Sequence, residues 1–487
     1  MPSAVNSLIS SSRSPIEYLR NHPAWVLLIS AFVFQLLGWT QDGLNVDSTT
    51  YAVIARNMAE HGSWLSPAYT PYYAPNFAEH PPLVMWVQGI IFLFFGASDS
   101  TARIFGQLCS VGSVMIVYLL GKEAAGRGYG FLAGLILLLT YNYMKIGNGA
   151  MLDVPMIFFG FVVLWSLARI HNGRTDLRTY AVAGAALGLS FLTKGVVSGP
   201  FWIAWLAAFF FLIGGRRHIA KLWLIPAIAA VIVIVYLLLD GLFNSSQFTR
   251  HYFLVQIWRS VKGAGLEHKA EWYQFILRFI ELYLPFVLLL PVGIYLILRR
   301  SMTILYPAII ALVFYFLFQS ASGKLYYHYF CPAYALSAPL AALPLSLILK
   351  EIGINRIATW FLLIWLLLAA IVTASGVRIH EIRSPEIYEL SETMNNLLEG
   401  RRSRDGLMIG PGRPKWDYVA KAVWYWRSDV YQVPDIETAA RRLAISDRFV
   451  YVLLKRQDEL STERQADCGL QKFAENDKLV IYVPASP

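Results

Sequence analysis

Long apolar runs recur along the first 376 residues of this 487-residue chain, and they constrain its fold more than any other feature. A helix that crosses a bilayer core needs about 20 mostly apolar residues, with about 17 as the usual lower limit. Eleven runs approach or exceed that length, at 23–40, 104–121, 129–146, 154–168, 179–193, 195–213, 222–240, 279–298, 302–320, 329–349 and 357–375. With 56% hydrophobic and 15% charged residues, the sequence predicts a polytopic α-helical membrane protein with about 11 to 13 transmembrane helices.

The charge and the cysteines narrow the classes of function. A net charge of +10 is typical of nucleic-acid binding proteins, but in a membrane protein basic residues usually collect in cytoplasmic loops, so we expect no nucleic-acid partner. Cys109, Cys331 and Cys468 lie far apart without CxxC spacing, which favours neither a disulfide framework nor a cysteine metal site. Residues 1–20 carry Arg13 and Arg20, and we interpret them as part of an uncleaved signal anchor.

A twelfth apolar run, "PPLVMWVQGIIFLFFG" at 81–96, suits either a short span or a helix lying on the membrane surface. If it does not cross and the N-terminus is cytoplasmic, five basic loops fall on the cytoplasmic side: "GKEAAGR", "RIHNGRTDLR", "GGRRHIAK", "LRR" and "KEIGINR". If it crosses, all five move outside, against the positive-inside rule. We therefore predict a surface helix on the outer face.

This topology divides the chain into a transmembrane domain at 1–376 and a second domain at 377–487. Two loops of the first domain lie outside, an outer loop at 41–103 and a long outer loop at 241–278. Residues 377–487 are polar, with helical patterns in "SPEIYELSETMNNLLEG" and "DIETAARRLA" and β-rich runs "GLMIG", "RFVYVLLK" and "KLVIYVP". They predict a small α/β domain on the outer side.

Two acidic residues stand at predicted helix starts on that side. Asp47 opens the stretch "NVDSTTYAVIARNMAEHG" at 45–62, whose apolar residues recur at helical spacing: Tyr51, Ile54, Ala55 and Met58. Asp153 follows in "NGAMLDVPM", with Pro155 in the first turn. Asp47 or Ser48, and likewise Asp153, can serve as N-caps. The alternative is that the two carboxylates hold one sugar through its hydroxyl groups, and we name both as candidate catalytic residues.

Basic and aromatic residues are predicted to gather on the same face. Lys194 in "FLTKGVV" and Lys324 in "SGKLYYHYF" each occupy a glycine-containing break between apolar helices. A single interfacial lysine usually snorkels to water, but two on one face also suit a phosphate cradle. Tyr327 and His328 stand beside them, and such aromatic groups either stack on a sugar or anchor the interface.

Two further groups of residues give weaker evidence for a functional site when each is considered alone. Glu79 and His80 precede a double proline in "NFAEHPPL" and either bind a cation, orient a substrate or remain solvated. The loop 243–272 is basic, with Arg250, His251, Arg259, Lys262 and Lys269, although it lies outside. Such residues need an anionic partner such as lipid phosphate, or else form an amphipathic helix on headgroups.

The order of these motifs resembles the C-type (GT-C) membrane glycosyltransferases, in particular the protein O-mannosyltransferase superfamily and its aminoarabinose (lipid A) transferase branch. An acidic residue before Y-A-x-I-A-R is followed by E-H-P-P-L, L-D, T-K-G and G-K-L-Y-Y, over roughly residues 20–350. The resemblance implies a GT-C fold and a polyprenyl-phosphate-linked sugar as donor. It matches Asp47 to the catalytic aspartate, Asp153 to the second acidic position, and Lys194 and Lys324 to the lysine motifs.

The same resemblance assigns the remaining candidates. His251 and Arg259 look like the basic pair of the long outer loop, and Glu79 with His80 falls where the aminoarabinose branch shows Glu-Lys. The histidine brings this chain nearer to the mannosyltransferase H-P-P-L pattern and weakens a phosphate contact from that position. Many relatives carry Asp-Glu where this chain has Asp47-Ser48, so one carboxylate must suffice.

We therefore expect a glycosyltransferase of a bacterial inner membrane that passes a sugar to an envelope acceptor at the outer face, with inversion. Lipid A or another glycolipid is the preferred acceptor, and a polysaccharide or protein hydroxyl is the next. A divalent metal near Glu79, His80 or His251 is left open, since no spacing demands one. The rival interpretations are a transporter or flippase of a lipid-linked sugar, which should carry ionisable residues in mid-span, and a membrane scaffold.

Overall fold

The computed structural model describes residues 22–39, 41–211, 220–262, 270–350, 352–378, 385–410 and 416–485. The predicted signal anchor, Lys269 and the side chain of Lys262 lie outside the described residues. Contacts divide the chain into two compact units. The first comprises Met1–Gln41, Glu79–Val84 and Arg103–Ile379, and the second comprises Asp42–Ala78, Met85–Ala102 and His380–Pro487.

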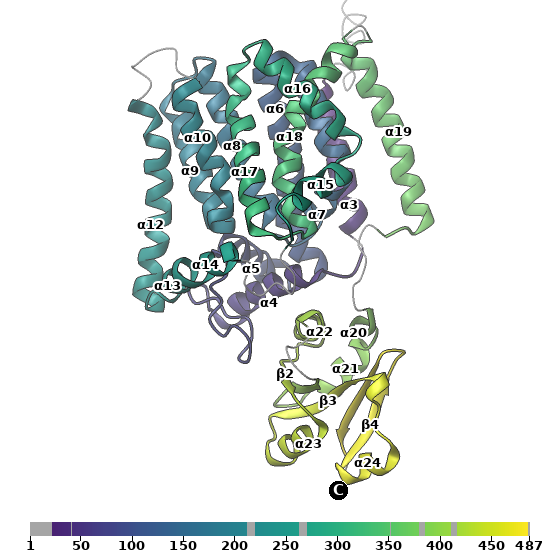
Figure 1. Cartoon of the computed structure of the whole chain (residues 1–487). Coiled ribbons are helices and arrows are strands. Elements are labelled where there is room, and N and C mark those ends of the chain that lie inside the picture. The colour runs from purple at the N-terminus through teal and green to yellow at the C-terminus, as the bar shows by residue number, and fades with distance from the viewer. Residues whose placement is uncertain are drawn as a thin grey trace, which may run out of the picture. The chain divides into compact units, whose positions relative to one another are not determined.

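The first unit is a bundle of long helices (Figure 1). Seven helical segments are long and apolar enough to cross a membrane, or eight if a bent pair counts as one, within the described residues. The helices are α3 (Pro23–Trp39), α6 (Asp99–Leu139), α7 (Tyr141–Gly147), α8 (Asp153–His171), α9 (Leu177–Lys194), α10 (Gly199–Phe211), α12 (Leu224–Asn244), α13 (Gln247–His251), α14 (Ile257–Lys262), α15 (Gln274–Leu282), α16 (Leu289–Arg299), α17 (Tyr306–Ser322), α18 (Cys331–Ile348) and α19 (Ile354–Ser375). Its core is apolar, as the eleven runs predict.

Helix α6 is a hairpin rather than one rod. Ala125 and Gly126 have non-helical backbone angles, with φ of −151° and 88°. A Cβ on Gly121 would lie 2.7 Å from Gly130 Cα, and one on Gly134 would lie 3.1 Å from the carbonyl oxygen of Val114. As the chain advances along the second half of α6, from Gly130 to Gly134, the positions that it approaches on the first half run backwards, from Gly121 to Val114. The two halves are therefore antiparallel, and the turn falls in the basic segment "GKEAAGR".

Helices α9 and α12 run parallel, so α10 between them must return in the opposite direction. A Cβ on Gly184 would lie 2.8 Å from the carbonyl oxygen of Ile225, and one on Gly188 would lie 3.1 Å from Ala229 Cα. The same order along both helices fixes their common direction. Small residues allow this close approach of backbones. The carboxyl ends of α9 and α12 consequently lie at the same end of the bundle.

The second unit combines the outer loop with the C-terminal residues. It contains α4 (Val46–His61) and most of α5 (Leu83–Phe95), with α20 (Pro385–Glu389), α21 (Ser391–Leu398), α22 (Trp416–Lys421), α23 (Ile436–Ile445) and α24 (Thr462–Asp467). A five-stranded sheet has the order β2-β1-β3-β5-β4, with β1 (Asp405–Ile409), β2 (Val430–Val433), β3 (Phe449–Lys455), β4 (Leu470–Glu475) and β5 (Leu479–Pro484). Strand β1 pairs in parallel with β2 and β3, and the other pairs are antiparallel.

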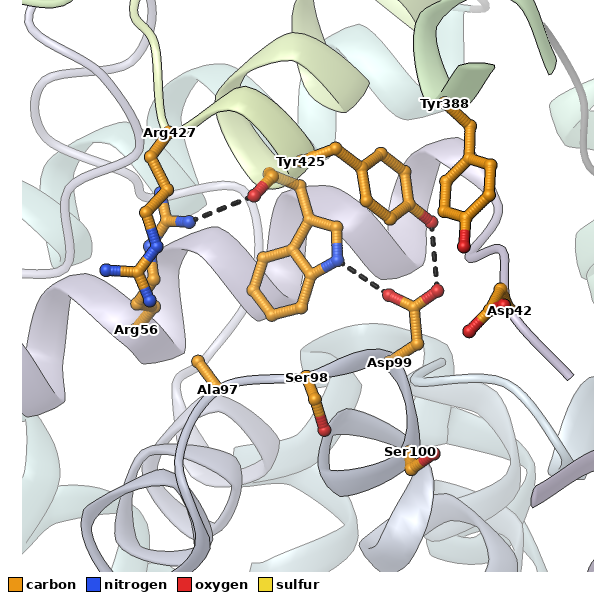
Figure 2. A pocket seen from close by; sticks show the side chains of 10 residues that line it. Asp42, Arg56, Ala97, Ser98, Asp99, Ser100, Tyr388, Tyr425 and Arg427 are labelled. Carbon is orange, nitrogen blue, oxygen red and sulfur yellow. Dashed lines mark hydrogen bonds between the residues drawn. The ribbon is translucent and has the colours of Figure 1, made fainter. Parts of the chain in front are cut away.

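One carboxylate joins three distant segments of this unit. Asp99 accepts hydrogen bonds from the backbone N–H of Gly43 (2.6 Å), from Trp424 Nε1 (2.7 Å) and from the Tyr425 hydroxyl (3.0 Å). Figure 2 shows the last two bonds. The Tyr425 hydroxyl also accepts from the N–H of Leu44 at 3.0 Å. The outer loop and the C-terminal residues are thus one folded body.

The helical pattern predicted at 45–62 is confirmed, but its capping is not. Tyr51, Ile54, Ala55 and Met58 all lie buried along α4. The N-cap is Asn45, whose side chain accepts a hydrogen bond from the N–H of Ser48. The prediction that Asp47 or Ser48 caps this helix was wrong, because the helix already begins at Val46, one residue before Asp47. Asp47 instead lies in the first turn, where its charge favours the helix dipole.

Candidate active site

A buried ion pair joins two of the predicted site residues. Lys194 Nζ lies 2.6 Å from Asp153 Oδ1, and the two side chains are 3% and 1% exposed. Asp153 is the first residue of α8, after an N-cap at Leu152 that makes no side-chain bond, so the predicted capping role for Asp153 was wrong. Its second oxygen, Oδ2, is buried and makes no hydrogen bond to the described residues. That oxygen is an acceptor held in place by the pair.

The glycine of the T-K-G motif allows a tyrosine to approach the backbone. Gly195 has φ of +61°, and a Cβ there would lie 1.7 Å from the Tyr252 hydroxyl oxygen. That hydroxyl accepts a hydrogen bond of 2.8 Å from the N–H of Val196. Asp240 fixes the segment that carries Tyr252, because its carboxylate accepts from the N–H groups of Phe248 and Thr249. The long outer loop therefore braces the break that holds Lys194.

A second turn presents Lys324 to the same aromatic ring as Lys194. Lys194 Nζ lies 5.0 Å and Lys324 Nζ 5.9 Å from the centroid of the Tyr329 ring. Both distances are within the range of cation–π attraction. Gln319 holds the turn by donating a hydrogen bond of 3.1 Å to the carbonyl oxygen of Lys324. Tyr315 donates to the carbonyl oxygen of Tyr329 at 2.5 Å and fixes the ring's backbone.

His80 lies close enough to these cations for their charges to act on it. Burial and the charges of Lys194, Lys324 and His328 keep the pKa of His80 well below its usual range. The pKa of Lys324 is also lowered, because burial and the charge of Lys194 outweigh the opposing effect of the exposed Glu79. The site therefore disfavours further positive charge and favours an anion that would offset the repulsion.

The structure thus brings together six of the predicted residues: Glu79, His80, Asp153, Lys194, Lys324 and His328. Tyr327 lies next to this group in sequence, but its hydroxyl oxygen accepts a 3.2 Å hydrogen bond from Arg278 of α15. His251 is half-buried beside Tyr252, and Arg259 is exposed on α14. Asp47 belongs to the second compact unit. Its action together with this cluster is part of the proposed function.

Tyr252 and Tyr329 were missed in the sequence analysis. Each stands one residue after a histidine that was named, and an aromatic residue near the interface is usually an anchor. The signal was the glycine of T-K-G, which implies that some group approaches its backbone closely. Among the described residues, no group of three or more His, Cys, Asp or Glu side chains is placed to hold a metal ion. A metal near Glu79, His80 or His251 was left open by the sequence, and none is assigned to these residues.

Comparisons with known proteins show what this chain is similar to. Residues 79–239 match the family described as dolichyl-phosphate-mannose-protein mannosyltransferase. Over 349 residues the chain is 27% identical to undecaprenyl phosphate-alpha-4-amino-4-deoxy-L-arabinose arabinosyl transferase 1 of Pseudomonas fluorescens, covering 68% of this chain and 60% of that protein. The corresponding transferase of Pseudomonas aeruginosa is 25% identical over 347 residues, with the same coverage.

Solved structures extend the likeness to nearly the whole chain. ArnT from Cupriavidus metallidurans bound to undecaprenyl phosphate matches with a TM-score of 0.75 and 15% identity, covering 94% of this chain and 97% of that one. The chain therefore shares the fold of these membrane glycosyltransferases. The archaeal oligosaccharyltransferase AglB from Archaeoglobus fulgidus shares the fold more distantly, with a TM-score of 0.57 and 14% identity over 90% of this chain and 70% of that one.

Within the described residues, the apolar helices of spanning length are those expected of a polytopic membrane protein. The predicted GT-C fold is confirmed at the level of architecture. The chain spans about 60% of the length of the curated relatives it matches.

Proposed function

We propose that this protein transfers a sugar from a polyprenyl-phosphate-linked donor to an envelope acceptor, with lipid A or another glycolipid preferred. The observation that carries the proposal is the cluster in which Lys194 and Lys324 share Tyr329 beside His80. These basic groups suit the phosphate of a glycosyl phosphodiester. Solved ArnT is bound to undecaprenyl phosphate, a molecule with that phosphate.

In the proposed reaction, the bond between the sugar's anomeric carbon and the donor phosphate oxygen breaks while a bond to the acceptor oxygen forms. The polyprenyl phosphate leaves with the electron pair, and direct displacement inverts the anomeric carbon. Lys324 stabilises the charge that develops on the leaving phosphate, since the ammonium of Lys194 is already bound to Asp153. One well-placed donor of this kind contributes about 3 to 4 kcal/mol. Arg259 supplements it from the long outer loop.

Two acidic residues have the remaining roles in the proposed reaction. Asp153 Oδ2 accepts a hydrogen bond from a hydroxyl group of the donor sugar, because it is buried and without a hydrogen bond to the described residues. Asp47 takes the proton of an acceptor hydroxyl, and such general-base catalysis commonly contributes about a hundred- to ten-thousand-fold. If the acceptor atom is a phosphate oxygen, no proton need be removed and Asp47 orients the acceptor.

We also propose eleven crossings, with the cluster, Asp47 and the C-terminal domain on the periplasmic side. The α6 hairpin and the return of α10 support counting each as a separate crossing. Helix α5 has 13 residues, about 20 Å of rise, against a hydrocarbon core of about 30 Å. Asp42–Ala78 and Met85–Ala102 both belong to the second unit, with only Glu79–Val84 between them in the first, which supports a surface helix. Ten crossings between residues 102 and 380 return the chain to the same side.

Reconstitution with a labelled polyprenyl phosphate sugar tests the function. Purified protein in liposomes that contain a glycolipid acceptor should release polyprenyl phosphate and move the label to the acceptor. The Asp47→Asn variant should insert and fold normally but lose transfer by at least about a hundredfold. Wild-type turnover in that variant would remove Asp47 from the mechanism. Movement of label across the bilayer without transfer would favour the flippase, and neither activity would favour a scaffold.

A further inference from the structure

The residues at 423–425 contact the segment that carries Asp47 at two places within the second unit. The N–H of Leu44, three positions before Asp47, donates a 3.0 Å hydrogen bond to the Tyr425 hydroxyl. Further along α4, Arg56 donates bonds of 3.0 and 3.2 Å to two backbone carbonyl oxygens of the same C-terminal residues. The bonded residues are 367 to 381 positions apart in the chain. A short C-terminal segment therefore holds both the start and the middle of α4.

Asp99 takes part in the first of these two contacts. Its Oδ2 atom accepts a hydrogen bond of 2.6 Å from the N–H of Gly43. The same atom accepts one of 3.0 Å from the Tyr425 hydroxyl, and Oδ1 accepts one of 2.7 Å from the indole of Trp424 (Figure 2). Hydrogen bonds to a carboxylate are about twice as strong as those between neutral groups. Gly43 and Leu44, two consecutive buried residues before α4, are thus held through their backbone N–H groups.

Little conformational freedom remains between this anchor and Asp47. Only Asn45 and Val46 separate Leu44 from Asp47. The Asn45 side chain accepts a 2.8 Å bond from the N–H of Ser48, which closes a turn around Asp47. The carbonyl oxygen of Val46 accepts bonds of 2.7 and 3.0 Å from the two threonine hydroxyls that follow Ser48. A shift of the residues at 43 and 44 must therefore move Asp47 as well.

The contact through Arg56 fixes the direction of α4. About 15 Å of helix separates Val46 from Arg56, at a rise of about 1.5 Å per residue. The Arg56 side chain is buried, and its guanidinium lies 5.5 Å from the centroid of the Trp424 ring. That ring lies 6.0 Å from the ring of Phe92 in α5. Because α4 is anchored at two points this far apart, it cannot swing about either one, and Asp47 keeps one position relative to the C-terminal residues of its unit.

We propose that Asp99 and Tyr425 are positioning residues for Asp47, so that the C-terminal residues take part in catalysis without touching the substrate. The inference rests on the proposed function, in which Asp47 acts on the acceptor. A general base must lie within about 2.6 to 3.2 Å of the atom whose proton it takes, and a displacement of about 1 Å can lower the rate about a hundredfold. Such accuracy requires supporting hydrogen bonds from rigid elements, and Asp99 and Tyr425 supply them.

The first test compares two tyrosine variants of the full chain in the liposome transfer assay. Tyr425→Phe removes the hydroxyl that binds Leu44 and Asp99 but keeps the ring. Tyr482→Phe is the matched control, because the Tyr482 hydroxyl also accepts a 3.0 Å bond from a backbone N–H in the same unit, that of Leu460. Tyr425→Phe should lower kcat about ten- to hundredfold and leave the KM for the donor unchanged. The control should change neither quantity. Asp99→Asn, which cannot accept all three hydrogen bonds, should behave as Tyr425→Phe does.

A double variant separates positioning from a merely structural role. If Tyr425 acts through Asp47, the variant with both Asp47→Asn and Tyr425→Phe should transfer sugar at the same residual rate as Asp47→Asn alone. Two independent effects would instead multiply. Multiplied effects would overturn the inference, and so would wild-type kcat in both Tyr425→Phe and Asp99→Asn.

Hydrogen exchange gives a second measurement that needs no turnover. In Tyr425→Phe, the backbone amides of residues 43–48 should exchange about tenfold faster than in the wild type, and in Tyr482→Phe they should not. Unchanged exchange in Tyr425→Phe would overturn the inference whether or not sugar is transferred. Faster exchange together with wild-type turnover in Asp47→Asn would support the anchoring of this segment and contradict the proposed role of Asp47 in the reaction.

Discussion

At the scale of single residues, the pair of Asp153 and Lys194 shows how one contact serves both stability and chemistry. Each side chain is almost completely buried, so neither charge is tolerable without the other. The pair fixes the ammonium beside Tyr329 and leaves one carboxylate oxygen for a ligand. In the proposed reaction, Lys194 therefore holds the site in shape, and Lys324 contacts the leaving phosphate.

Removing one charge of this pair should lower the free energy of unfolding more than removing both charges. Asp153→Asn leaves a buried lysine uncompensated, and we expect a loss of about 3 to 5 kcal/mol in the free energy of unfolding. The double variant Asp153→Asn with Lys194→Gln should regain most of that loss, while sugar transfer stays absent in both. Thermal unfolding in detergent and the transfer assay measure the two effects. A single variant as stable as the wild type would contradict the buried pair.

Asp429 should make the stability of the second unit depend on pH. Burial, and then the charge of Asp405, raises the pKa of Asp429 to about 6, against the opposing effects of Arg56 and Arg448. Between about pH 4 and 6 the folded chain keeps a proton that the unfolded chain has lost, so stability falls as pH rises through this window. Asp429→Asn should therefore be more stable than wild type by roughly 1 to 3 kcal/mol at pH 7.5.

Scanning calorimetry at pH 4, 6 and 7.5 measures that difference, which should disappear near pH 4. Asp458→Asn is the control, because Asp458 is exposed in the same unit. A stabilisation that is the same at every pH would mean that the effect of Asp429→Asn does not come from its ionisation.

The sequence predicts where most of these residues lie but not which ones meet. Lys194 and Asp153 were each predicted at a helix end on the outer side, and their separate motifs suggested separate tasks. Their pairing depends on the packing of α8 against α9, and no pattern along the chain encodes that register. A helix cap was the alternative to a catalytic role for Asp47, because its residue type is favoured there, yet Asn45 is favoured equally and comes first.

At the scale of elements, Gly195 should tolerate substitution far less than other glycines in left-handed backbone. Gly195→Ala meets the Tyr252 hydroxyl as well as the backbone strain of its φ of +61°. Gly173→Ala, at φ of +86°, meets only the strain, because nothing lies within 4 Å of its Cβ position. That strain alone costs roughly 1 to 2 kcal/mol. We expect Gly195→Ala to lose more stability and also to raise the KM for the lipid-linked donor.

Thermal unfolding and donor titration of both variants check this expectation. Tyr252→Phe removes only the hydroxyl that Val196 binds, and it should raise the donor KM without the steric penalty. Equal behaviour of Gly195→Ala and Gly173→Ala would show that the close approach of Tyr252 has no consequence for the site.

Some of the helices and strands were predicted from the sequence, and others were not. Strands β1, β3 and β5 lie on the three predicted β-rich runs. Strands β2 and β4 were not predicted, because β2 has four residues and β4 carries exposed polar residues along an edge of the sheet. Most apolar runs coincide with one helix, but the run at 129–146 is shared by α6 and α7, and the run at 279–298 is shared by α15 and α16, which are bent by 114°. The break within α6 falls in the predicted loop between 104–121 and 129–146, at Gly126, whose φ of 88° few other residues adopt.

At the scale of the whole molecule, the orientation in the membrane remains a prediction with a direct test. A reporter active only in the periplasm, fused after residue 376, should give signal, and the same reporter in the α6 turn should not. The five basic loops require this result, and so do eleven proposed crossings that start from a cytoplasmic N-terminus. A cytoplasmic signal after residue 376 would remove the outer-face site and the mechanism with it.

The grouping of the outer loop with the C-terminal residues was beyond sequence analysis. Helical and strand periodicity are local, whereas Arg56 binds the carbonyl oxygen of Trp424 across 368 positions. Nothing in either segment alone indicates the other as its partner. Two pockets of this unit, one lined by Asn57 and Arg404 and the other by Asp99 and Tyr425, were not predicted for the same reason, since each draws its lining from both segments.

The carboxylate of Asp99 has a consequence for how the protein is made. Its partners Trp424 and Tyr425 lie 325 and 326 positions further along the chain. At about 5 to 20 residues per second, the ribosome needs roughly 16 to 65 s to reach them after Asp99 has been synthesised. During that interval the helices that follow must enter the bilayer while the outer loop waits as half of an unfinished domain. The period in which proteases and chaperones can act on this loop is therefore set by translation rather than by its own folding rate.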